Sequence, residues 1–266
     1  MTPEGSVSFD RAAGYYDATR ILPPETHAAM CGMLVAELRN RGRCLEIGVG
    51  TGRIAIPITE AGVDLVGVDI SRSMLDKLVE KTGTAPLDLA VADATHLPFA
   101  EDSFGGAFCV HVLHLIAGWR DAVRELIRVV RPGGLLLFDL GSADPARPGG
   151  WQGVPREIEQ RFTSEAGIER RHPGITSTSD LDDLLSEAGA ILRELRPVPG
   201  SMQLAPSVLL SLFEEGIFAW TWDLEPEARA RAADKVRRWA AGRYGDLDQP
   251  QPLDVVVAFR AYDLPE

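Results

Sequence analysis

One short segment, residues 45–53, constrains the fold of this chain more than any other. Apolar residues typical of a β-strand lead into three alternating glycines, Gly48, Gly50 and Gly52, and an apolar pattern with helical spacing follows. Glycine has no Cβ atom, so a tight turn between strand and helix is unstrained and a ligand can approach the backbone closely. The segment therefore predicts a strand–loop–helix unit with a ligand site at its turn.

A carboxylate follows at the end of the next apolar segment. Asp69 comes directly after residues 65–68, whose pattern predicts a buried strand. Ligands of open α/β sheets bind outside the carboxyl ends of the strands, where Asp69 would lie beside the glycines. A carboxylate there can accept hydrogen bonds from both hydroxyls of a ribose. We therefore expect a pocket for a cofactor that contains a nucleoside.

The glycine spacing distinguishes between classes of nucleoside cofactor. In the dinucleotide fingerprint G-x-G-x-x-G the third glycine follows the second by three positions, and Arg53 stands at that position here. Glu46 precedes the first glycine by two residues, and a carboxylate there suits a cationic ligand better than a pyrophosphate. The pattern therefore disfavours a nicotinamide-dependent oxidoreductase, which would share the architecture.

The pattern E-x-G-x-G-x-G, with an acidic residue closing the next strand, resembles motif I of the class I S-adenosylmethionine-dependent methyltransferases. Residues 92–95 around Asp93 and the turn at residues 131–134 are also similar to that family, in its ubiquinone-biosynthesis-like branch (methyltransferase type 11/25). The resemblance covers residues 42–141. It implies a Rossmann-like α/β fold, a three-layer sandwich on a seven-stranded, mainly parallel sheet whose last strand is reversed.

The resemblance also implies roles for individual residues. The glycine loop would hold the amino-acid end and ribose of S-adenosyl-L-methionine, Asp69 the ribose hydroxyls and Asp93 the adenine, and the product would be S-adenosyl-L-homocysteine. The implied function is methyl transfer to a small-molecule acceptor. The expected cofactor site comprises Glu46, Gly48, Val49, Gly50, Gly52, Arg53, Asp69, Ile70, Met74, Asp93, Ala94, His111 and Tyr16.

Methyl transfer from a sulfonium needs no particular catalytic side chain. The methyl group is already activated, so holding it in line with the acceptor and excluding water supplies much of the acceleration. A base is needed only where the acceptor must lose a proton. His111, His114 and Tyr16 are the weak candidates, with packing as the simpler interpretation of both histidines and helix docking as the alternative for Tyr16. No third ligand accompanies the histidines, and Asp139 is interpreted as a polar strand end, so no metal site is expected.

The net charge of the chain bears on the acceptor. Lys and Arg number 27 against 39 Asp and Glu, which gives a net charge of −12 at pH 7. Affinity for nucleic acid depends mainly on neutralising phosphates, so this charge opposes the alternative of a tRNA or rRNA methyltransferase. The other alternative is a protein that binds S-adenosylmethionine without catalysis, because no required catalytic side chain can be named.

Outside the recognisable core, the apolar patterns predict further elements. Residues 191–198 and 253–262 are the predicted sixth and seventh strands, and a helical insertion between them forms either a lid or a cover for the sheet. In that insertion, Trp220 and Trp222 are interpreted as core residues rather than as an acceptor pocket. The expected organisation is a helical N-terminal cap (1–40), an α/β core (41–199 and 251–266) and the helical insertion (200–250).

Composition sets the expected environment. No apolar run is long enough to span a membrane, and the first six residues lack the basic and apolar regions of a signal peptide. Cys31, Cys44 and Cys109 are odd in number and widely spaced, which favours free thiols in a reducing compartment. We therefore expect a cytoplasmic protein, and the sequence leaves open whether it forms a homo-oligomer.

Overall fold

The computed structural model of the chain describes residues 5–20, 22–83, 87–141, 153–169 and 172–266. The chain forms two compact units. The first comprises Met1–Gly149, Pro173–Val198 and Val257–Glu266, and the second comprises Gly150–His172 and Pro199–Val256.

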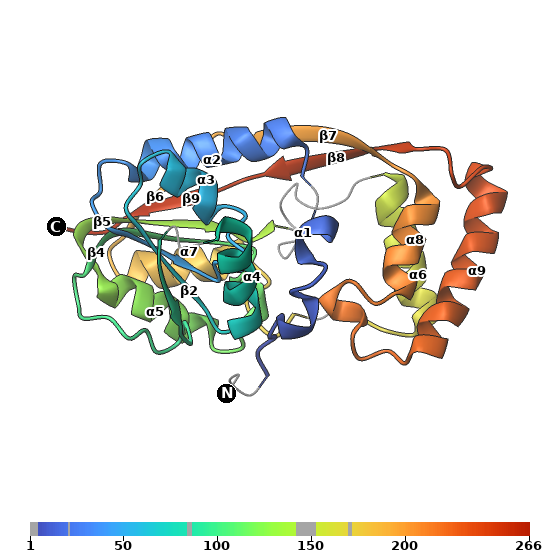
Figure 1. Cartoon of the computed structure of the whole chain (residues 1–266), viewed down its shortest axis with the longest axis horizontal. Helices are drawn as coiled ribbons and strands as arrows, with labels where there is room; N and C mark the ends of the chain where they lie inside the picture. Colours follow the sequence, from blue (N-terminus) through green and yellow to red (C-terminus); the bar gives the residue numbers. More distant parts are fainter. Residues whose placement is uncertain (1–4, 21, 84–86, 142–152, 170–171) are drawn as a thin grey trace. The chain divides into compact units, whose positions relative to one another are not determined.

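The first unit is built on a seven-stranded sheet with the order β3-β2-β1-β4-β5-β9-β6 (Figure 1). Pairing is parallel from β3 through β5, and β9 runs antiparallel to both of its neighbours. The strands are β1 (Cys44–Ile47), β2 (Leu65–Asp69), β3 (Asp88–Val91), β4 (Phe104–Val110), β5 (Val130–Asp139), β6 (Ile191–Glu194) and β9 (Arg260–Asp263). The expected seven-stranded, mainly parallel sheet with a reversed last strand is confirmed.

Helices cover both faces of this sheet. Apolar side chains of α2, α3 and α4 pack on one face, and those of α5 and α7 pack on the other, so the expected three-layer sandwich is also confirmed. The helical elements of the first unit are η1 (Asp10–Ala12), α1 (Tyr16–Thr19), α2 (Pro24–Leu38), α3 (Ala55–Glu60), α4 (Arg72–Thr82), η2 (Leu113–Leu115), α5 (Trp119–Val129) and α7 (Thr178–Glu187).

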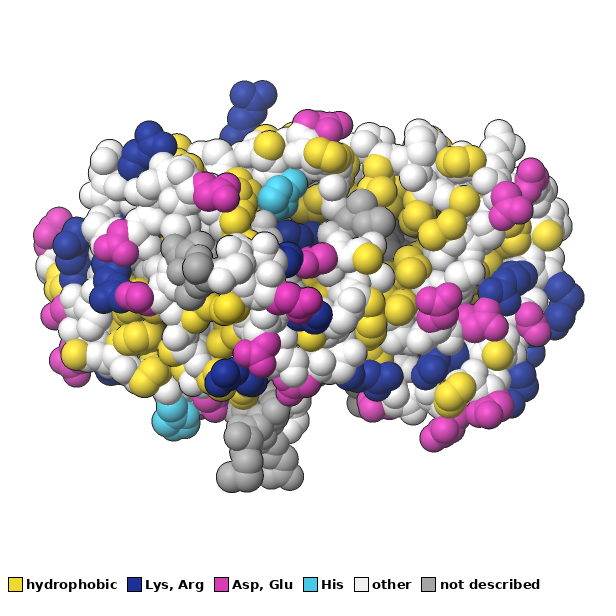
Figure 2. All heavy atoms as spheres, in the orientation of Figure 1, with side chains coloured by type: hydrophobic (Ala, Val, Ile, Leu, Met, Phe, Trp, Pro, Cys, Tyr) yellow, Lys and Arg dark blue, Asp and Glu magenta, His cyan; other side chains and the backbone are white. Residues whose placement is uncertain are grey.

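The surface carries charges of both signs. On the face shown in Figure 2, basic and acidic side chains of the described residues are interspersed, and the basic ones form no continuous area. Among the described residues, no helix combines the length and the apolar character needed to cross a bilayer.

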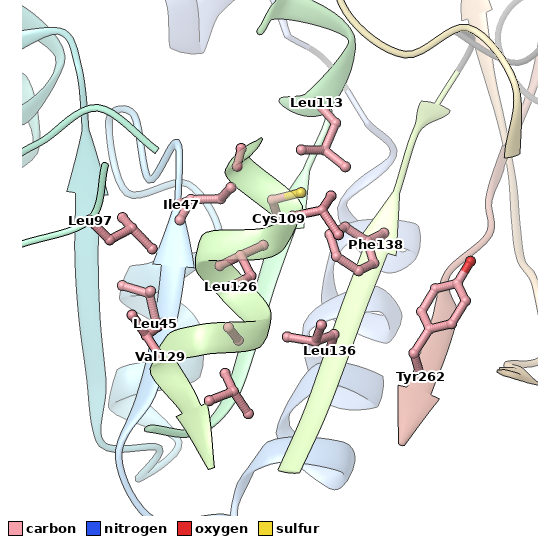
Figure 3. Close-up of a cluster of buried hydrophobic side chains, with 14 of the residues drawn as sticks. Leu45, Ile47, Leu97, Cys109, Leu113, Leu126, Val129, Leu136, Phe138 and Tyr262 are labelled. Atoms are coloured by element: carbon pink, nitrogen blue, oxygen red, sulfur yellow. The ribbon is translucent and has the colours of Figure 1, made fainter. Parts of the chain in front are cut away.

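The central strands are buried on both faces, as expected of a parallel sheet between helical layers. Figure 3 shows side chains of β1, β4, β5 and α5 converging in one apolar cluster, among them Leu45, Cys109, Leu126 and Phe138. These residues are fully buried. The packing fixes the carboxyl ends of the central strands, from which the candidate site residues project.

The three cysteines are free and buried, as the sequence led us to expect. Burial raises the pKa of the Cys31 and Cys44 thiols to about 11. The reactive thiolate is therefore scarce at neutral pH, and these side chains act as apolar core residues.

The second unit is a helical cluster with an aromatic core. The Trp220 ring lies 5.1 Å from that of Phe213 and 6.0 Å from that of Phe162, between ring centroids, so Trp220 packs against this core while remaining partly exposed. Trp222 is also half-buried, and its indole N–H donates a hydrogen bond to the Gly216 carbonyl oxygen at 3.0 Å. Sequence-based boundaries assign α6 to the α/β core, whereas α6 packs against α8 and α9 in the structure. The helical elements of this unit are α6 (Val154–Ala166), α8 (Pro206–Glu214), η4 (Ala219–Thr221) and α9 (Pro226–Tyr244).

The prediction of one strand over residues 253–262 is wrong. Two strands occupy this region, because β8 (Gln251–Val257) pairs with β7 (Val198–Leu204) in a separate two-stranded sheet, and β9 begins only at Arg260. The predicted sixth strand, residues 191–198, also ends early, because β6 ends at Glu194 and Val198 already belongs to β7. A continuous apolar run shows that residues are β-prone and does not show which strands they pair with.

The predicted turn at residues 131–134 lies within β5 as an irregularity of the strand. Phe104 pairs with Val130 and Gly106 pairs with Leu135, so β5 carries extra residues between the two pairs. Gly133 there has a φ of +67°, a left-handed conformation that glycine adopts without strain.

Truncating the core of the first unit should lower its stability. Leu126→Ala removes a fully buried side chain of α5, so we expect the free energy of unfolding in urea to fall by about 2–5 kcal/mol. Val79→Ala on α4 is the control, because Val79 is 38% exposed. A loss for Leu126→Ala no larger than that of the control would contradict the packing described.

Candidate functional site

The glycine-rich loop connects β1 to α3 through three left-handed glycines. Gly48, Gly50 and Gly52 have φ values of +69°, +55° and +77°. A Cβ atom on Gly48 would lie 2.3 Å from a Val112 methyl carbon, and one on Gly52 would lie 2.7 Å from Leu78 Cγ. Glycine is therefore required both for the backbone conformation and for close packing against the segment after β4 and against α4.

Asp69, the last residue of β2, binds the backbone of this loop. Its Oδ2 accepts a hydrogen bond from the Gly50 N–H at 2.8 Å, and its Oδ1 accepts one from the Ser71 N–H at 2.8 Å. Desolvation raises the pKa of Asp69, and these two N–H groups oppose the rise. Each oxygen of an ionised carboxylate can accept a further hydrogen bond. The structure thus brings Asp69 to the glycine loop.

Glu46 lies on β1, two residues before the first glycine of the loop, and is only 3% exposed. Its Oε2 has no hydrogen-bond partner among the described residues. Burial and then the Asp69 charge raise the pKa of Glu46 well above its ordinary value, while Arg53 opposes the rise. A buried polar atom without a partner is costly, so a cation or a hydrogen-bond donor supplied by a ligand fits this position.

The loops after β2 and β3 continue the same edge of the sheet. The Met74 methyl carbon lies 3.4 Å from the position that a Cβ on Gly50 would occupy, so α4 packs directly on the glycine loop. Asp93 follows β3, and its Oδ1 accepts a hydrogen bond from the Thr95 N–H at 2.9 Å. Because β1, β2 and β3 are parallel neighbours, Asp93 lies at the same sheet edge as Asp69. Ile70 and Ala94, both half-buried, adjoin these acids in the chain.

The N-terminal segment is held to these loops by two carboxylates whose partners the sequence does not indicate. Asp10 Oδ1 accepts a hydrogen bond from Ser71 Oγ at 2.6 Å, and this bond lowers the pKa of Asp10. Asp17 Oδ1 accepts one from Thr51 Oγ1 at 2.5 Å, and its Oδ2 pairs with Lys81 Nζ at 2.8 Å. The segment therefore contacts the loops after both β1 and β2.

Tyr16 belongs to a small cluster on this N-terminal segment. Its ring packs edge-on against Phe9 at 5.8 Å, and the Arg20 guanidinium lies 5.3 Å from its centroid. The Arg20 carbonyl oxygen in turn accepts a hydrogen bond from Arg53, the residue after the last glycine of the loop. Tyr16 thus packs within the N-terminal segment, and this segment in turn contacts the glycine loop through Arg20.

The two candidate histidines differ in their surroundings. His111 directly follows β4, and its Nε2 lies 3.1 Å from Asp139 Oδ2 at the end of β5. His114 lies in η2, half-buried, and its carbonyl oxygen accepts a hydrogen bond from the Gly174 N–H at 3.0 Å. Within the described residues there is no group of three or more His, Cys, Asp or Glu arranged to hold a metal ion.

Comparisons with known proteins assign part of the chain to a family. Residues 45–138 match a family described as a methyltransferase domain. The biotin biosynthesis bifunctional protein BioHC of Cellvibrio japonicus is 35% identical over 166 residues, which are 61% of this chain and 33% of that protein. A demethylmenaquinone methyltransferase of Chlamydia trachomatis is 32% identical over 151 residues, 55% of this chain and 63% of that protein. The chain thus matches less than two thirds of the length of these relatives.

A solved structure agrees with the fold. The phosphoethanolamine N-methyltransferase 2 of Haemonchus contortus, in complex with phosphomonomethylethanolamine and S-adenosylhomocysteine, has a TM-score of 0.54 at 18% identity. The similarity covers 98% of this chain and 61% of that one. Residues 45–138, which carry the glycine loop, Asp69 and Asp93, therefore form a methyltransferase domain.

Proposed function

We propose that this protein binds S-adenosylmethionine and transfers its methyl group to a small-molecule acceptor. The observation that carries the proposal is the Asp69 carboxylate, held beside the glycine loop by the Gly50 N–H at the carboxyl ends of β1 and β2. A bound S-adenosylmethionine supplies a methyl carbon that is already activated by its sulfonium. The task of the protein is then to hold donor and acceptor in line and to exclude water.

The residues at this edge fit such a cofactor. Asp69 has acceptor capacity for the ribose hydroxyls, and Asp93, one strand further along the sheet, would contact the adenine. Glu46 Oε2 is buried and has no hydrogen-bond partner in the described part of the chain, so Glu46 suits the ammonium group of the cofactor, either by direct contact or by ordering the loop. The proposed contacts are completed by Gly48, Val49, Gly50, Gly52, Arg53, Ile70, Met74, Ala94 and Tyr16.

Three observations support a small molecule as the acceptor. The names of the two relatives refer to biotin biosynthesis and to demethylmenaquinone. The net charge of −12 opposes binding to a polyanion. Basic side chains on the face seen in Figure 2 are also separated by acidic ones, so that face offers no continuous track for phosphates.

Replacing Asp69 should weaken cofactor binding. In Asp69→Ala the ribose hydroxyls lose a buried acceptor, so the affinity for S-adenosylhomocysteine should fall by about 1–3 kcal/mol, roughly 5- to 150-fold. Isothermal titration calorimetry measures this loss. Asp64→Ala is the matched control, because Asp64 is an exposed carboxylate just before the opposite end of β2. Unchanged affinity in a folded Asp69→Ala protein would remove Asp69 from the site.

Glu46 should make stability fall as pH rises. Because the pKa of Glu46 is raised well above 4.5 in the folded protein, the unfolded chain loses this proton first as pH increases. The contribution of the protonated carboxyl is therefore complete below pH 4.5 and is lost as pH rises towards the folded-state pKa. In urea denaturation of the apo protein at several pH values, Glu46→Gln should gain stability relative to wild type as pH increases from 4.5.

The control for this pH series is Glu60→Gln, which changes an exposed carboxyl of α3. Its difference from wild type should stay nearly constant with pH. If the difference between Glu46→Gln and wild type were equally constant, the burial of an unpaired Glu46 carboxyl would be contradicted.

A further inference from the structure

His111 and Asp139 form a pair at the ends of two adjacent strands. β4 and β5 run parallel, with Val110 opposite Asp139, so the residue after β4 lies beside the last residue of β5. The His111 N–H donates a hydrogen bond to the Asp139 carbonyl oxygen at 2.9 Å, and His111 Nε2 lies 3.1 Å from Asp139 Oδ2. Backbone and side chain of the histidine are thus both directed to the same residue.

The backbone around this pair has an uncommon conformation at His111 and packs closely against the imidazole ring. His111 has a φ of +57°, a left-handed conformation that is uncommon outside glycine. A Cβ atom on Gly141 would lie 2.6 Å from His111 Nε2, so the imidazole ring lies directly against the glycine backbone. The Gly141 N–H also donates to Asp139 Oδ1 at 2.8 Å. Unfavourable backbone conformations that a structure retains are concentrated at functional sites.

The pair joins a buried acid to an accessible base. Asp139 is 3% exposed, whereas 41% of the His111 side chain is exposed. Asp139 Oδ2 accepts no hydrogen bond from any described residue, although His111 Nε2 lies 3.1 Å away. Catalytic hydrogen bonds are often poorly aligned before substrate binds. A small ring rotation would let Nε2–H donate to Asp139, which leaves Nδ1 as the proton acceptor.

The pair also lies next to the proposed cofactor site. Val112, the residue after His111, packs so closely on the glycine loop that a Cβ on Gly48 would overlap it. An accessible base one residue from that contact is placed to serve the acceptor. His111 follows β4, whereas Asp69 and Glu46 lie on β2 and β1, so the proposed base is separate from these two acids of the proposed cofactor site.

We propose that His111 is the general base for the acceptor, that Asp139 positions it, and that the acceptor is a weak oxygen acid, a phenol or an enol. This inference rests on the proposed function and names its substrate class. The proton of the acceptor O–H moves to His111 Nδ1 as the oxygen forms its bond to the methyl carbon. The carbon–sulfur bond breaks, its electron pair stays on sulfur as the neutral thioether, and the imidazolium later releases its proton to water.

The test uses methyl-labelled S-adenosylmethionine with a panel of phenols of graded acidity and a set of primary amines. Wild type should label phenols and not amines. His111→Asn retains a residue type that tolerates positive φ, and it should label weakly acidic phenols about 100-fold more slowly. The loss should shrink for a dinitrophenol, which is already ionised at neutral pH. His96→Gln, which changes an exposed histidine after β3, should match wild type.

The role of Asp139 is tested by determining which ring nitrogen of His111 carries the proton. Asp139→Asn should show the same dependence on phenol acidity, because it acts through His111. The nitrogen NMR shifts of His111 should report a proton on Nε2 in wild type. In Asp139→Asn the proton should shift to Nδ1, since an amide N–H can donate to Nε2. An unchanged tautomer would overturn the positioning role.

Binding of S-adenosylhomocysteine separates this inference from the proposed function. Affinity should be equal in wild type and in Asp139→Asn, because Asp139 is not among the proposed cofactor contacts. A loss of methyl transfer that is the same for every phenol would mean a structural role for His111. Transfer to amines alone, or to no phenol by a wild type that binds the cofactor, would overturn the substrate class. Failure of wild type to bind S-adenosylhomocysteine would overturn the proposed function itself.

Discussion

The hydrogen bonds of Asp69 are the interaction on which the arrangement of the site depends. The Asp69 carboxylate accepts hydrogen bonds from the Gly50 N–H in the glycine loop and from the Ser71 N–H at the start of α4. Ser71 Oγ then accepts from the Met74 N–H, which caps α4, and donates to Asp10 in the N-terminal segment. The ends of two strands, a helix and the N-terminal segment are thereby joined through the side chains of Asp69 and Ser71.

The charge balance at this carboxylate favours one kind of ligand. Asp69 and Glu46 are both desolvated, which raises the pKa of each, and the Asp69 charge adds to the rise at Glu46. A ligand that brings positive charge stabilises the ionised forms, whereas a pyrophosphate would add further repulsion. The cationic sulfonium and ammonium groups of S-adenosylmethionine agree with this balance, and the two phosphates of a nicotinamide dinucleotide oppose it.

The parts of the site that sequence could predict are those set by short-range chemistry. Three alternating glycines after an apolar strand require a tight loop, and an acid at the end of the next parallel strand must lie at the same sheet edge. This reasoning placed Gly50 and Asp69 correctly, and the bond between them is observed. The interpretation of Trp220 agrees with its packing against the core of the second unit, because apolar residues at helical spacing most often face a core.

The parts that sequence could not predict depend on contacts between distant segments. The bonds from Asp10 to Ser71 and from Asp17 to Thr51 join residues 61 and 34 positions apart, with no local pattern to mark them. The pairing of His111 with Asp139 requires the register of β4 against β5. The apolar run that forms β8 gave no sign of its separate partner, β7.

Parallel calorimetric titrations of the wild-type protein with S-adenosylhomocysteine, S-adenosylmethionine and NAD test the central claim most directly. The glycine spacing, the hydrogen bonds of Asp69 and the buried Glu46 oxygen, which has no partner among the described residues, predict binding of the first two ligands and none of NAD. Binding of NAD alone would contradict the interpretation of the glycine loop, and with it the cofactor that the proposed function requires.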